Sequence, residues 1–265
     1  MADNETPAPV AFVTGASAGT GAEIAYALAE TGHDVAVVAR RTAALEDLAR
    51  AIEALGRRAL VLTIDLLDAD AIGAGIDRFL AWSAGRCDVL VNAAGIPGPL
   101  SPEIGDFDLA AFDAVIATNL RAPFVILSRL LPVMRANRTG RVINIGGNHG
   151  MRGRAGRASY STSKWGLRGL SRSAALEAGK DGVTVNYIAP GAIAVQRMKD
   201  RWKASAQAEG KDEGAVLESY VASMNIALGR TNEPVDIVNS VLFLAGPGGR
   251  NITGQEIVID GGVIV

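Results

Sequence analysis

The alternation of short apolar runs with helical segments constrains this fold more than any other feature of the sequence. An apolar run at 10–14 is followed by helical spacing at 19–31 and a second apolar run at 35–38. Further strands are expected at 59–64, 89–91, 142–145, 183–188 and 256–259, and further helices at 45–55, 107–134, 159–178 and 234–244. The runs are apolar throughout, which is typical of parallel strands covered by helices on both faces. The sequence therefore predicts an α/β fold with a single doubly wound parallel sheet.

The chain shows no internal repeat and no linker. We expect residues 10–265 to form one domain after a short disordered lead at 1–9. Residues 196–227 break the alternation, because they are charged and helical and no strand follows them. We interpret this segment as a small helical substrate lobe over one end of the sheet.

Composition excludes several classes of protein. The formal net charge of −2 lacks the basic excess of a nucleic-acid-binding protein. A lone cysteine, Cys87, rules out an internal disulfide framework and a cysteine-based zinc site, and we expect no metal. No apolar run reaches the ~18 residues of a membrane span, and the first residues lack the layout of a signal peptide. We therefore expect a soluble, cytoplasmic protein with neither a membrane nor a nucleic-acid partner.

A glycine-rich loop joins the first expected strand to the first expected helix. Its sequence is Thr14-Gly15-Ala16-Ser17-Ala18-Gly19-Thr20-Gly21, with the spacing Gly-x3-Gly-x-Gly. Glycines let a backbone turn tightly and approach a pyrophosphate, whose charge then lies against the N–H groups of the helix N-terminus. A plain turn needs only one or two glycines, so three glycines in this context favour a dinucleotide-binding loop.

The residues after the second strand indicate which dinucleotide is bound. Folds that bind NAD(H) place an Asp or Glu there to hold the ribose 2′-hydroxyl. Here the strand ends at Ala39 and is followed by Arg40 and Arg41. Their guanidinium groups can donate paired hydrogen bonds to a 2′-phosphate. A solvated surface pair is the alternative, but the missing carboxylate favours NADP(H) over NAD(H).

A tyrosine and a lysine four residues apart open the helix expected at 159–178. Tyr160 and Lys164 share one face of that helix, because the α-helical repeat brings positions i and i+4 together. A phenol has a pKa of about 10 and needs help to exchange a proton at neutral pH, and an ammonium one turn away stabilises its phenolate. The pair alone is common by chance. Together with the glycine loop it indicates acid–base chemistry beside a bound dinucleotide.

In this order, the motifs resemble those of the short-chain dehydrogenase/reductase family from Val10 to Gly262. The other matching residues are Asp65, Asn92-Ala93-Ala94-Gly95, Asn119, Pro190-Gly191, Thr253-Gly254 and Asp260-Gly261-Gly262. The resemblance implies a Rossmann-type oxidoreductase that passes hydride between NAD(P)(H) and the carbonyl or secondary alcohol carbon of a small molecule. It implies cofactor contacts at Gly15, Ser17, Gly19, Thr20, Gly21, Arg40, Arg41, Asp65, Leu66, Asn92, Ala94, Gly95, Tyr160, Lys164, Pro190, Gly191 and Ile193.

The resemblance also implies a role for each residue of the catalytic set. Tyr160 would exchange the proton with the substrate oxygen, and Lys164 would lower the Tyr160 pKa and bind the nicotinamide ribose. Asn119 would hold a water that links Lys164 to bulk solvent, and Asp65 would bind the adenine ring. The family further implies a homotetramer or homodimer in which the helices at 107–134 and 159–178 pack between subunits, with the apolar contributors Leu130, Leu131, Leu167 and Leu170.

Two positions depart from the family pattern. A serine that donates to the substrate carbonyl normally lies 13 residues before the tyrosine, but Gly147 holds that position here. The surrounding run is Ile145-Gly146-Gly147-Asn148-His149-Gly150, which contains no serine. A threonine that contacts the nicotinamide carboxamide in the family is replaced by Val195.

The missing serine leaves two interpretations open. Either Asn148 or His149 supplies the second donor to the carbonyl, or the protein has little turnover and acts as a cofactor-binding sensor or scaffold. Loss of one donor to a developing oxyanion typically costs about 10²–10³ in rate, which slows an enzyme without abolishing catalysis. The retained Asn119, Tyr160 and Lys164 therefore favour a working oxidoreductase of the alcohol–carbonyl class (EC 1.1.1).

Arginines gather on the loop before Tyr160 and in the helical lobe. Arg152, Arg154 and Arg157 lie where they would attract a carboxylate or phosphate of the substrate. A solvated or subunit-facing cluster is the alternative, and the net charge of −2 favours it. The cations of the lobe are balanced by acidic neighbours and are expected on a solvated helix face: Arg197, Lys199, Arg201 and Lys203.

Overall fold

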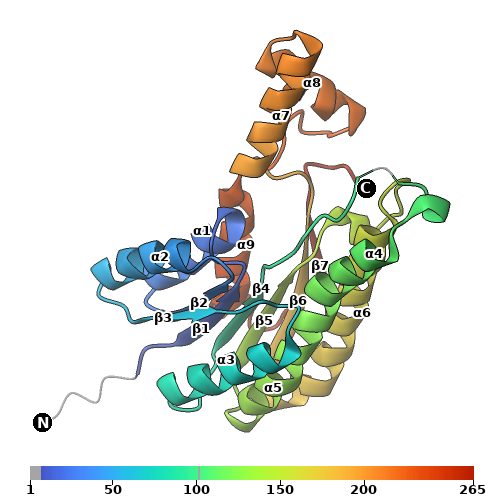
Figure 1. Ribbon diagram of the computed structural model, residues 1–265. Coiled ribbons are helices and arrows are strands. Elements are labelled where there is room, and N and C mark those ends of the chain that lie inside the picture. The colour runs from blue at the N-terminus through green and yellow to red at the C-terminus, as the bar shows by residue number, and fades with distance from the viewer. Residues whose placement is uncertain (1–6, 101) are drawn as a thin grey trace, which may run out of the picture.

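The apolar runs form one seven-stranded sheet in the computed structural model, which describes residues 7–100 and 102–265. Every strand pair is parallel, and the order across the sheet is β3-β2-β1-β4-β5-β6-β7. The strands are β1 (Val10–Thr14), β2 (Asp34–Ala39), β3 (Ala59–Thr63), β4 (Val89–Asn92), β5 (Gly140–Ile145), β6 (Val183–Pro190) and β7 (Glu256–Ile259). Helices flank the sheet on both sides (Figure 1), which confirms the predicted doubly wound α/β fold.

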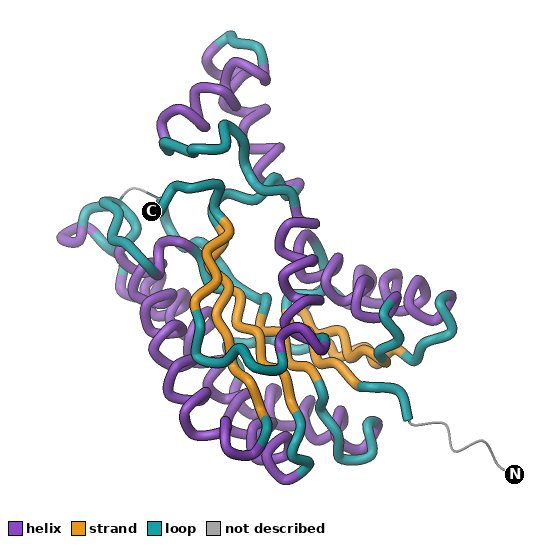
Figure 2. The backbone as a smooth tube through the Cα atoms, turned by 180° about the vertical axis from the view of Figure 1, so that it is seen from behind, coloured by secondary structure: helices purple, strands orange, loops and turns teal. Residues whose placement is uncertain are grey.

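The helices form two layers, with a hydrophobic core on each face of the sheet. One layer consists of α1 (Gly19–Glu30), α2 (Thr42–Ala54) and α9 (Pro234–Ala245). The other consists of α3 (Ala69–Trp82), α5 (Ala122–Ala136) and α6 (Ala158–Ala178). The view from behind shows the strands enclosed between these layers (Figure 2). Each helix buries its apolar stripe against the sheet, so both faces of the sheet are removed from water.

Helix α3 was not among the expected elements, although its local signals are present in the sequence. Asp68 caps its N-terminus, because the carboxylate accepts hydrogen bonds from two backbone N–H groups of the first turn. Ile72, Ile76 and Phe79 recur at helical spacing and are buried in the core. The crossover between two parallel strands also requires a connecting element.

The helix expected at 107–134 has an irregular centre. Helix α4 (Leu109–Ile116) continues into α5 through a π-helical segment at Ala117–Arg121, which contains Asn119. Proline has no N–H, so Pro123 cannot give the carbonyl of Asn119 its ordinary α-helical hydrogen bond. π-Helical turns within α-helices are frequent at functional sites, so this irregular segment agrees with a functional role for Asn119.

The stretch Leu109–Ala136 is long and apolar enough to cross a membrane by length and composition, with a mean hydropathy of 1.4. Polar and charged residues interrupt this stretch, so it contains no continuous apolar run of the length of a membrane span. In the fold, Ile126, Leu130 and Met134 of this stretch pack into the core beside the sheet. Part of its apolar character thus serves packing within the chain.

The leucines expected between subunits lie inside the chain instead. Leu130, Leu131 and Leu167 are buried in clusters formed by one chain, and Leu170 is partly buried against them. A helix that packs on a sheet has its apolar face inward, and spacing alone does not distinguish that face from one that meets another subunit. The large apolar side chains exposed on α5 and α6 are Phe124, Trp165 and Leu176.

Residues 196–227 project from one end of the sheet as α7 (Gln196–Glu209) and α8 (Glu213–Ser223), drawn in orange in Figure 1. The two helices share a small core around Trp202. At the other end of the chain, residues 1–6 of the expected disordered lead lie outside the described residues. Pro9 is tied to the sheet, because its carbonyl accepts a hydrogen bond from the N–H of Asp34.

Candidate active site

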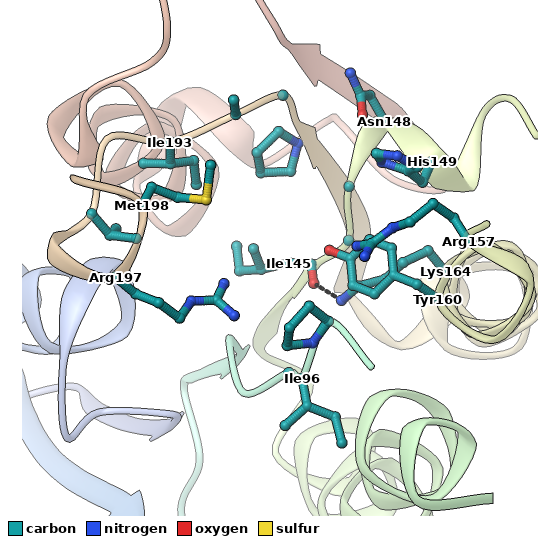
Figure 3. A pocket seen from close by; sticks show the side chains of 18 of the residues that line it. Ile96, Ile145, Asn148, His149, Arg157, Tyr160, Lys164, Ile193, Arg197 and Met198 are labelled. Carbon is teal, nitrogen blue, oxygen red and sulfur yellow. Dashed lines mark hydrogen bonds between the residues drawn. The ribbon is translucent and has the colours of Figure 1, made fainter. Parts of the chain in front are cut away.

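The strand order reverses between β1 and β4, which places the loops after these strands in one crevice. In parallel α/β sheets, ligands bind at the carboxyl ends of the strands at such a reversal. The loops after β1, β4, β5 and β6, together with the start of α7, line a single cleft here (Figure 3). Its volume is about 600 Å³, which is enough for a small molecule beside the nicotinamide end of a dinucleotide.

Backbone conformation or close packing requires glycine at each of the three glycine positions in the loop after β1. Gly15 and Gly19 have φ angles of +73° and +54°, which side-chain-bearing residues rarely adopt. A Cβ at Gly15 would also lie 2.8 Å from the Cα of Ala94, so the loops after β1 and β4 touch only because this residue is glycine. A Cβ at Gly21 would lie 2.4 Å from the carbonyl oxygen of Gly15. The loop is therefore folded tightly onto the start of α1.

The N-terminus of α1 suits the diphosphate of a dinucleotide. The N-cap residue, Ala18, has no side chain that could accept hydrogen bonds from the first turn. Gly19, Thr20 and Gly21 line the cleft, so the free N–H groups of that turn are available to an anion. The residues present thus fit an NAD(P)(H) diphosphate, as the sequence predicts.

The predicted 2′-phosphate site lies at the end of β2. Arg40 and Arg41 are exposed there, and Arg41 donates a hydrogen bond from Nη2 to the carbonyl oxygen of Ser17 at 2.9 Å. This bond holds one guanidinium beside the glycine loop. Asp65 follows β3 at the surface, and Leu66 is buried next to it.

Two of the predicted cofactor-binding residues, Asn92 and Ala94, also connect the segments that form the crevice. Asn92 donates from Nδ2 to Oδ1 of Asn144 at 2.8 Å and is buried between β4 and β5. The N–H of Ala94 donates to the hydroxyl of Thr14 at 3.2 Å. Gly95 does line the cleft. The side chain of Asn92 and the N–H of Ala94 are thus engaged within the crevice wall, and contact of these two residues with the cofactor stays a prediction.

The predicted pair on α6 meets in the cleft. Lys164 is buried and donates from Nζ to the carbonyl oxygen of Ile145 at 3.0 Å, and Nζ lies 5.6 Å from the centre of the Tyr160 ring. Burial lowers the pKa of Lys164 to about 8. Burial also raises the pKa of Tyr160, while the cations of Arg157 and Arg197 act in the opposite direction. A half-buried phenol that lines the cleft beside an ammonium can exchange a proton with a bound carbonyl or alcohol.

Asn119 bonds to the loop after β4. Its Oδ1 accepts from the N–H of Ile96 at 2.8 Å, and its Nδ2 donates to the carbonyl of Ile96 at 2.9 Å and to the hydroxyl of Ser163 at 3.1 Å. A Cβ at Gly95 would lie 3.3 Å from Oδ1 of Asn119 and 3.5 Å from Nζ of Lys164. Asn119 and Lys164 thus face the same glycine, and the water between them stays a prediction.

Tyr187 is a site residue that the sequence did not reveal. It is buried on β6, and its hydroxyl accepts from the N–H of Gly147 at 3.1 Å and donates to the carbonyl of Gly147 at 3.0 Å. A Cβ at Gly146 would lie 1.8 Å from Cζ of Tyr187, and one at Gly150 would lie 2.2 Å from its hydroxyl. Tyr187 therefore supports the loop in which the family serine is missing. The only sequence signal for this contact is the series of glycines at 146, 147 and 150, which indicates that a bulky group packs closely against the loop.

The two candidates for the missing donor differ in their surroundings. Asn148 is buried and its Nδ2 donates to Oδ2 of Asp260 at 3.3 Å, which engages one of the two N–H donors of this amide. His149 lies edge to face with Tyr160, with the ring centres 5.6 Å apart. Burial and the neighbouring arginines, Arg157 foremost, lower the pKa of His149 to about 4. At neutral pH its ring is uncharged and carries one N–H, so the geometry favours His149.

Arginines from two segments reach the cleft. Arg154 and Arg157 come from the loop before α6, and the Arg157 guanidinium lies 4.8 Å from the centre of the Tyr160 ring. Arg197 and Arg201 come from α7. Both side chains are exposed, as the prediction of a solvated helix face requires, and α7 turns this exposed side toward the cleft. Val195, which takes the position of the family threonine, also lines the cleft.

Comparison with known sequences gives matches along nearly the whole chain. A family model described as short chain dehydrogenase matches residues 9–206. An uncharacterized oxidoreductase, YxjF, of Bacillus subtilis strain 168 is 33% identical over 253 residues, which cover 96% of this chain and 97% of that protein. The 3-oxoacyl-(acyl-carrier-protein) reductase FabG of Staphylococcus aureus strain Mu50 is 37% identical over 255 residues, with coverage of 96% and 97%.

Solved structures give the same result. L-Sorbose reductase from Gluconobacter frateurii, complexed with NADPH and L-sorbose, superposes with a TM-score of 0.90 at 26% identity, over 97% of this chain and 96% of that chain. NAD⁺-bound xylitol dehydrogenase superposes with a TM-score of 0.86 at 27% identity, over 96% and 98%. The chain therefore belongs to the short-chain dehydrogenase/reductase family of oxidoreductases.

Proposed function

We propose that this protein is an NADP(H)-dependent oxidoreductase that interconverts a carbonyl and a secondary alcohol (EC 1.1.1 type). The observation that carries the proposal is the pair of half-buried Tyr160 and buried Lys164 in the same cleft as the uncapped N-terminus of α1. Relatives named as reductases and a dehydrogenase support this reaction class. NADPH consumption with a panel of ketones and 3-oxo esters tests it directly.

In the proposed mechanism the bound cofactor supplies or accepts a hydride at the nicotinamide ring. During reduction, the Tyr160 hydroxyl donates its proton to the substrate oxygen and becomes a phenolate. The Lys164 ammonium stabilises that phenolate, and the carbonyl of Ile145 fixes the position of Nζ. His149 donates its N–H to the same substrate oxygen, where negative charge develops. Oxidation runs through the same groups in reverse.

The proposed preference for NADP(H) is carried by Arg40 and Arg41, since related structures contain either NADPH or NAD⁺. Arg40→Asp removes one guanidinium and adds the carboxylate that suits a ribose 2′-hydroxyl. We expect wild-type protein to bind NADPH at least tenfold more tightly than NADH, and the variant to narrow or reverse that preference. Fluorescence titration of both cofactors measures it. Equal wild-type affinities would contradict the assignment.

The alternative function is a cofactor-binding sensor or scaffold with little turnover, which the missing serine at Gly147 favours. The two functions are distinguished by His149. If its N–H replaces the serine hydroxyl, His149→Ala should lower kcat at least tenfold, or about 1.4 kcal/mol in barrier, with NADPH affinity unchanged. Steady-state kinetics and cofactor titration measure both quantities.

The serine can be restored as a matched test. Gly147 has a φ of 165°, which is extended backbone, and a Cβ there would lie 3.2 Å from the Tyr160 hydroxyl. This contact is tight, so the Tyr160 side chain must shift slightly to admit a serine. Gly147→Ser should keep or raise activity and rescue His149→Ala unless the added hydroxymethyl group blocks the substrate. If His149→Ala and Asn148→Ala are both silent while Gly147→Ser raises turnover by orders of magnitude, no neighbour replaces the serine and the sensor function becomes the better one.

We also propose that the protein works in the cytoplasm as a homotetramer or homodimer. Phe124 of α5 and Trp165 of α6 support the proposed assembly, because they leave large apolar surfaces exposed on adjacent helices of one chain. Light scattering at micromolar concentration should give the mass of a dimer or tetramer. The double variant Phe124→Glu/Trp165→Glu should have a lower mass, because charged side chains would weaken contact between subunits. The mass of a single chain for the wild type would contradict the proposal.

A further inference from the structure

The proton-transfer chemistry assigned to Tyr160 does not use the arginines of the cleft. Arg154 and Arg157 belong to the loop before α6, and Arg197 and Arg201 lie one turn apart on α7. Figure 3 shows Arg157 beside Tyr160, and Arg197 reaching toward the same space from across the cleft. Two segments that are distant in the sequence therefore bring four guanidinium groups to one opening.

These cations are not balanced within residues 7–100 and 102–265. The lining of the cleft there contains no Asp or Glu, and none of the four arginines forms an ion pair in that part of the chain. Nη1 of Arg157 is buried there without a hydrogen-bond partner, and Nη1 of Arg154 meets the sulfur of Met224 at 3.1 Å. Burial and repulsion from the other arginines lower the pKa of Arg157. Arg154, Arg197 and Arg201 are exposed, so water solvates them, but the half-buried guanidinium of Arg157 lacks a partner for Nη1 and would gain one from a bound anion.

The cofactor accounts for part of the cluster at most. Its diphosphate is expected at the glycine loop, and Arg197 lies near that loop because Val195 packs against Gly19. Arg154 and Arg157 belong to the wall of the cleft that carries Tyr160. These two arginines therefore face the space that the substrate would occupy.

We propose that Arg154, Arg157, Arg197 and Arg201 bind an anionic group, a carboxylate or a phosphate monoester, at the end of the substrate remote from its carbonyl. The inference rests on the proposed oxidoreductase function and deepens it by naming the substrate class. Guanidinium groups bind both oxyanions through paired, charge-assisted hydrogen bonds. The remaining lining is largely apolar, which suits a short aliphatic keto acid or keto phosphate: Ile96, Pro97, Leu100, Met198 and Tyr220.

Binding is tested first, because it does not depend on turnover. The protein is saturated with NADP⁺ and titrated calorimetrically with 4-oxopentanoate, 4-oxopentyl phosphate and methyl 4-oxopentanoate. These probes share a ketone and differ in the terminal group. Both charged probes should bind at least tenfold more tightly than the neutral ester, and added salt should weaken only their binding. The tighter of the two charged probes identifies the source of the anion as carboxylate or phosphate.

Variants then assign the effect to the cluster. Arg154→Gln/Arg201→Gln should lower the ratio of kcat/KM for the acid to that for the ester at least tenfold, through a higher KM for the acid. Arg154→Lys/Arg201→Lys should retain most of the ratio. The matched controls are Arg152→Gln on the same loop and Lys199→Gln on the same helix, because neither residue lines the cleft. The controls should leave the ratio unchanged.

Selective binding of the charged probes that is lost in the double Gln variant supports the proposal. Equal or absent binding of all three probes overturns it, as does an unchanged preference in that variant. If the charged probes bind selectively but neither they nor the panel of ketones and 3-oxo esters leads to NADPH consumption, the oxidoreductase function fails while the anion site stands.

Discussion

Replacing Tyr160 with Phe should lower kcat for carbonyl reduction by about 10²–10⁴-fold, the usual contribution of a general acid. The substitution keeps the ring, which packs edge to face with His149 and under the guanidinium of Arg157. It removes only the hydroxyl, which is the proton donor in the proposed mechanism. NADPH oxidation followed by absorbance measures the loss.

Cofactor affinity and thermal stability are the controls for this variant. NADPH should still bind, because the glycine loop and the arginines after β2 are untouched. The melting temperature should stay within a few degrees of wild type, since the phenol hydroxyl forms no hydrogen bond within the described residues. A variant that turns over at nearly the wild-type rate would show that another group transfers the proton.

Lys164→Met should also reduce turnover strongly, by at least about 10²-fold, because the phenolate formed at Tyr160 loses its stabilising charge. Methionine has a similar length and fills the buried space without a cation. The side chain is buried at 3% exposure, so solvent cannot replace the lost ammonium. Retention of normal activity by this variant would exclude Lys164 from the mechanism.

The same variant should change how stability depends on pH. Burial lowers the pKa of Lys164 from 10.5 to about 8. Between these values the unfolded chain binds a proton that the folded chain has released, so wild-type stability rises with pH across this window. Below pH 8 the folded protein keeps a buried ammonium, which costs stability. Lys164→Met lacks this contribution.

Urea unfolding of both proteins at pH 7 and pH 10 measures the difference. The free energy of unfolding of the variant minus that of wild type should be more positive at pH 7 than at pH 10 by about 2 kcal/mol. The hydrogen bond from Nζ to the carbonyl of Ile145 contributes at both pH values as long as it persists, so its free-energy contribution cancels in this comparison. A difference that does not vary with pH would mean that Lys164 titrates as an exposed lysine.

The elements with strong local signals were predictable from the sequence. β1 at Val10–Thr14 and β7 at Glu256–Ile259 occur where the apolar runs predict them. Helix α3 is absent from the expected elements although the cap at Asp68 and the apolar spacing together indicate a helix. The π-helical segment around Asn119 has only a weak signal, since it depends on how α4 and α5 pack as well as on Pro123.

For the candidate site, the sequence indicated the residue types and the structure decided their surroundings. Asn148 and His149 are adjacent, and the sequence alone does not show which of them can donate a hydrogen bond to the substrate. Only the fold brings Asp260 from the far end of the chain to occupy the amide of Asn148. Tyr187 likewise acts on Gly147 from a different strand, and no local pattern predicts that contact.

The sequence by itself determined the parallel α/β sheet, the dinucleotide loop from Gly15 to Gly21 and the pairing of Tyr160 with Lys164. These features follow from periods of two or 3.6 residues and from glycine conformation, which are local properties of a chain. Only the tertiary structure decided that Arg197 joins Arg157 at the cleft, and that Asn92 turns into the sheet. Those outcomes depend on how the lobe and the strands pack, and packing joins residues that no sequence spacing relates.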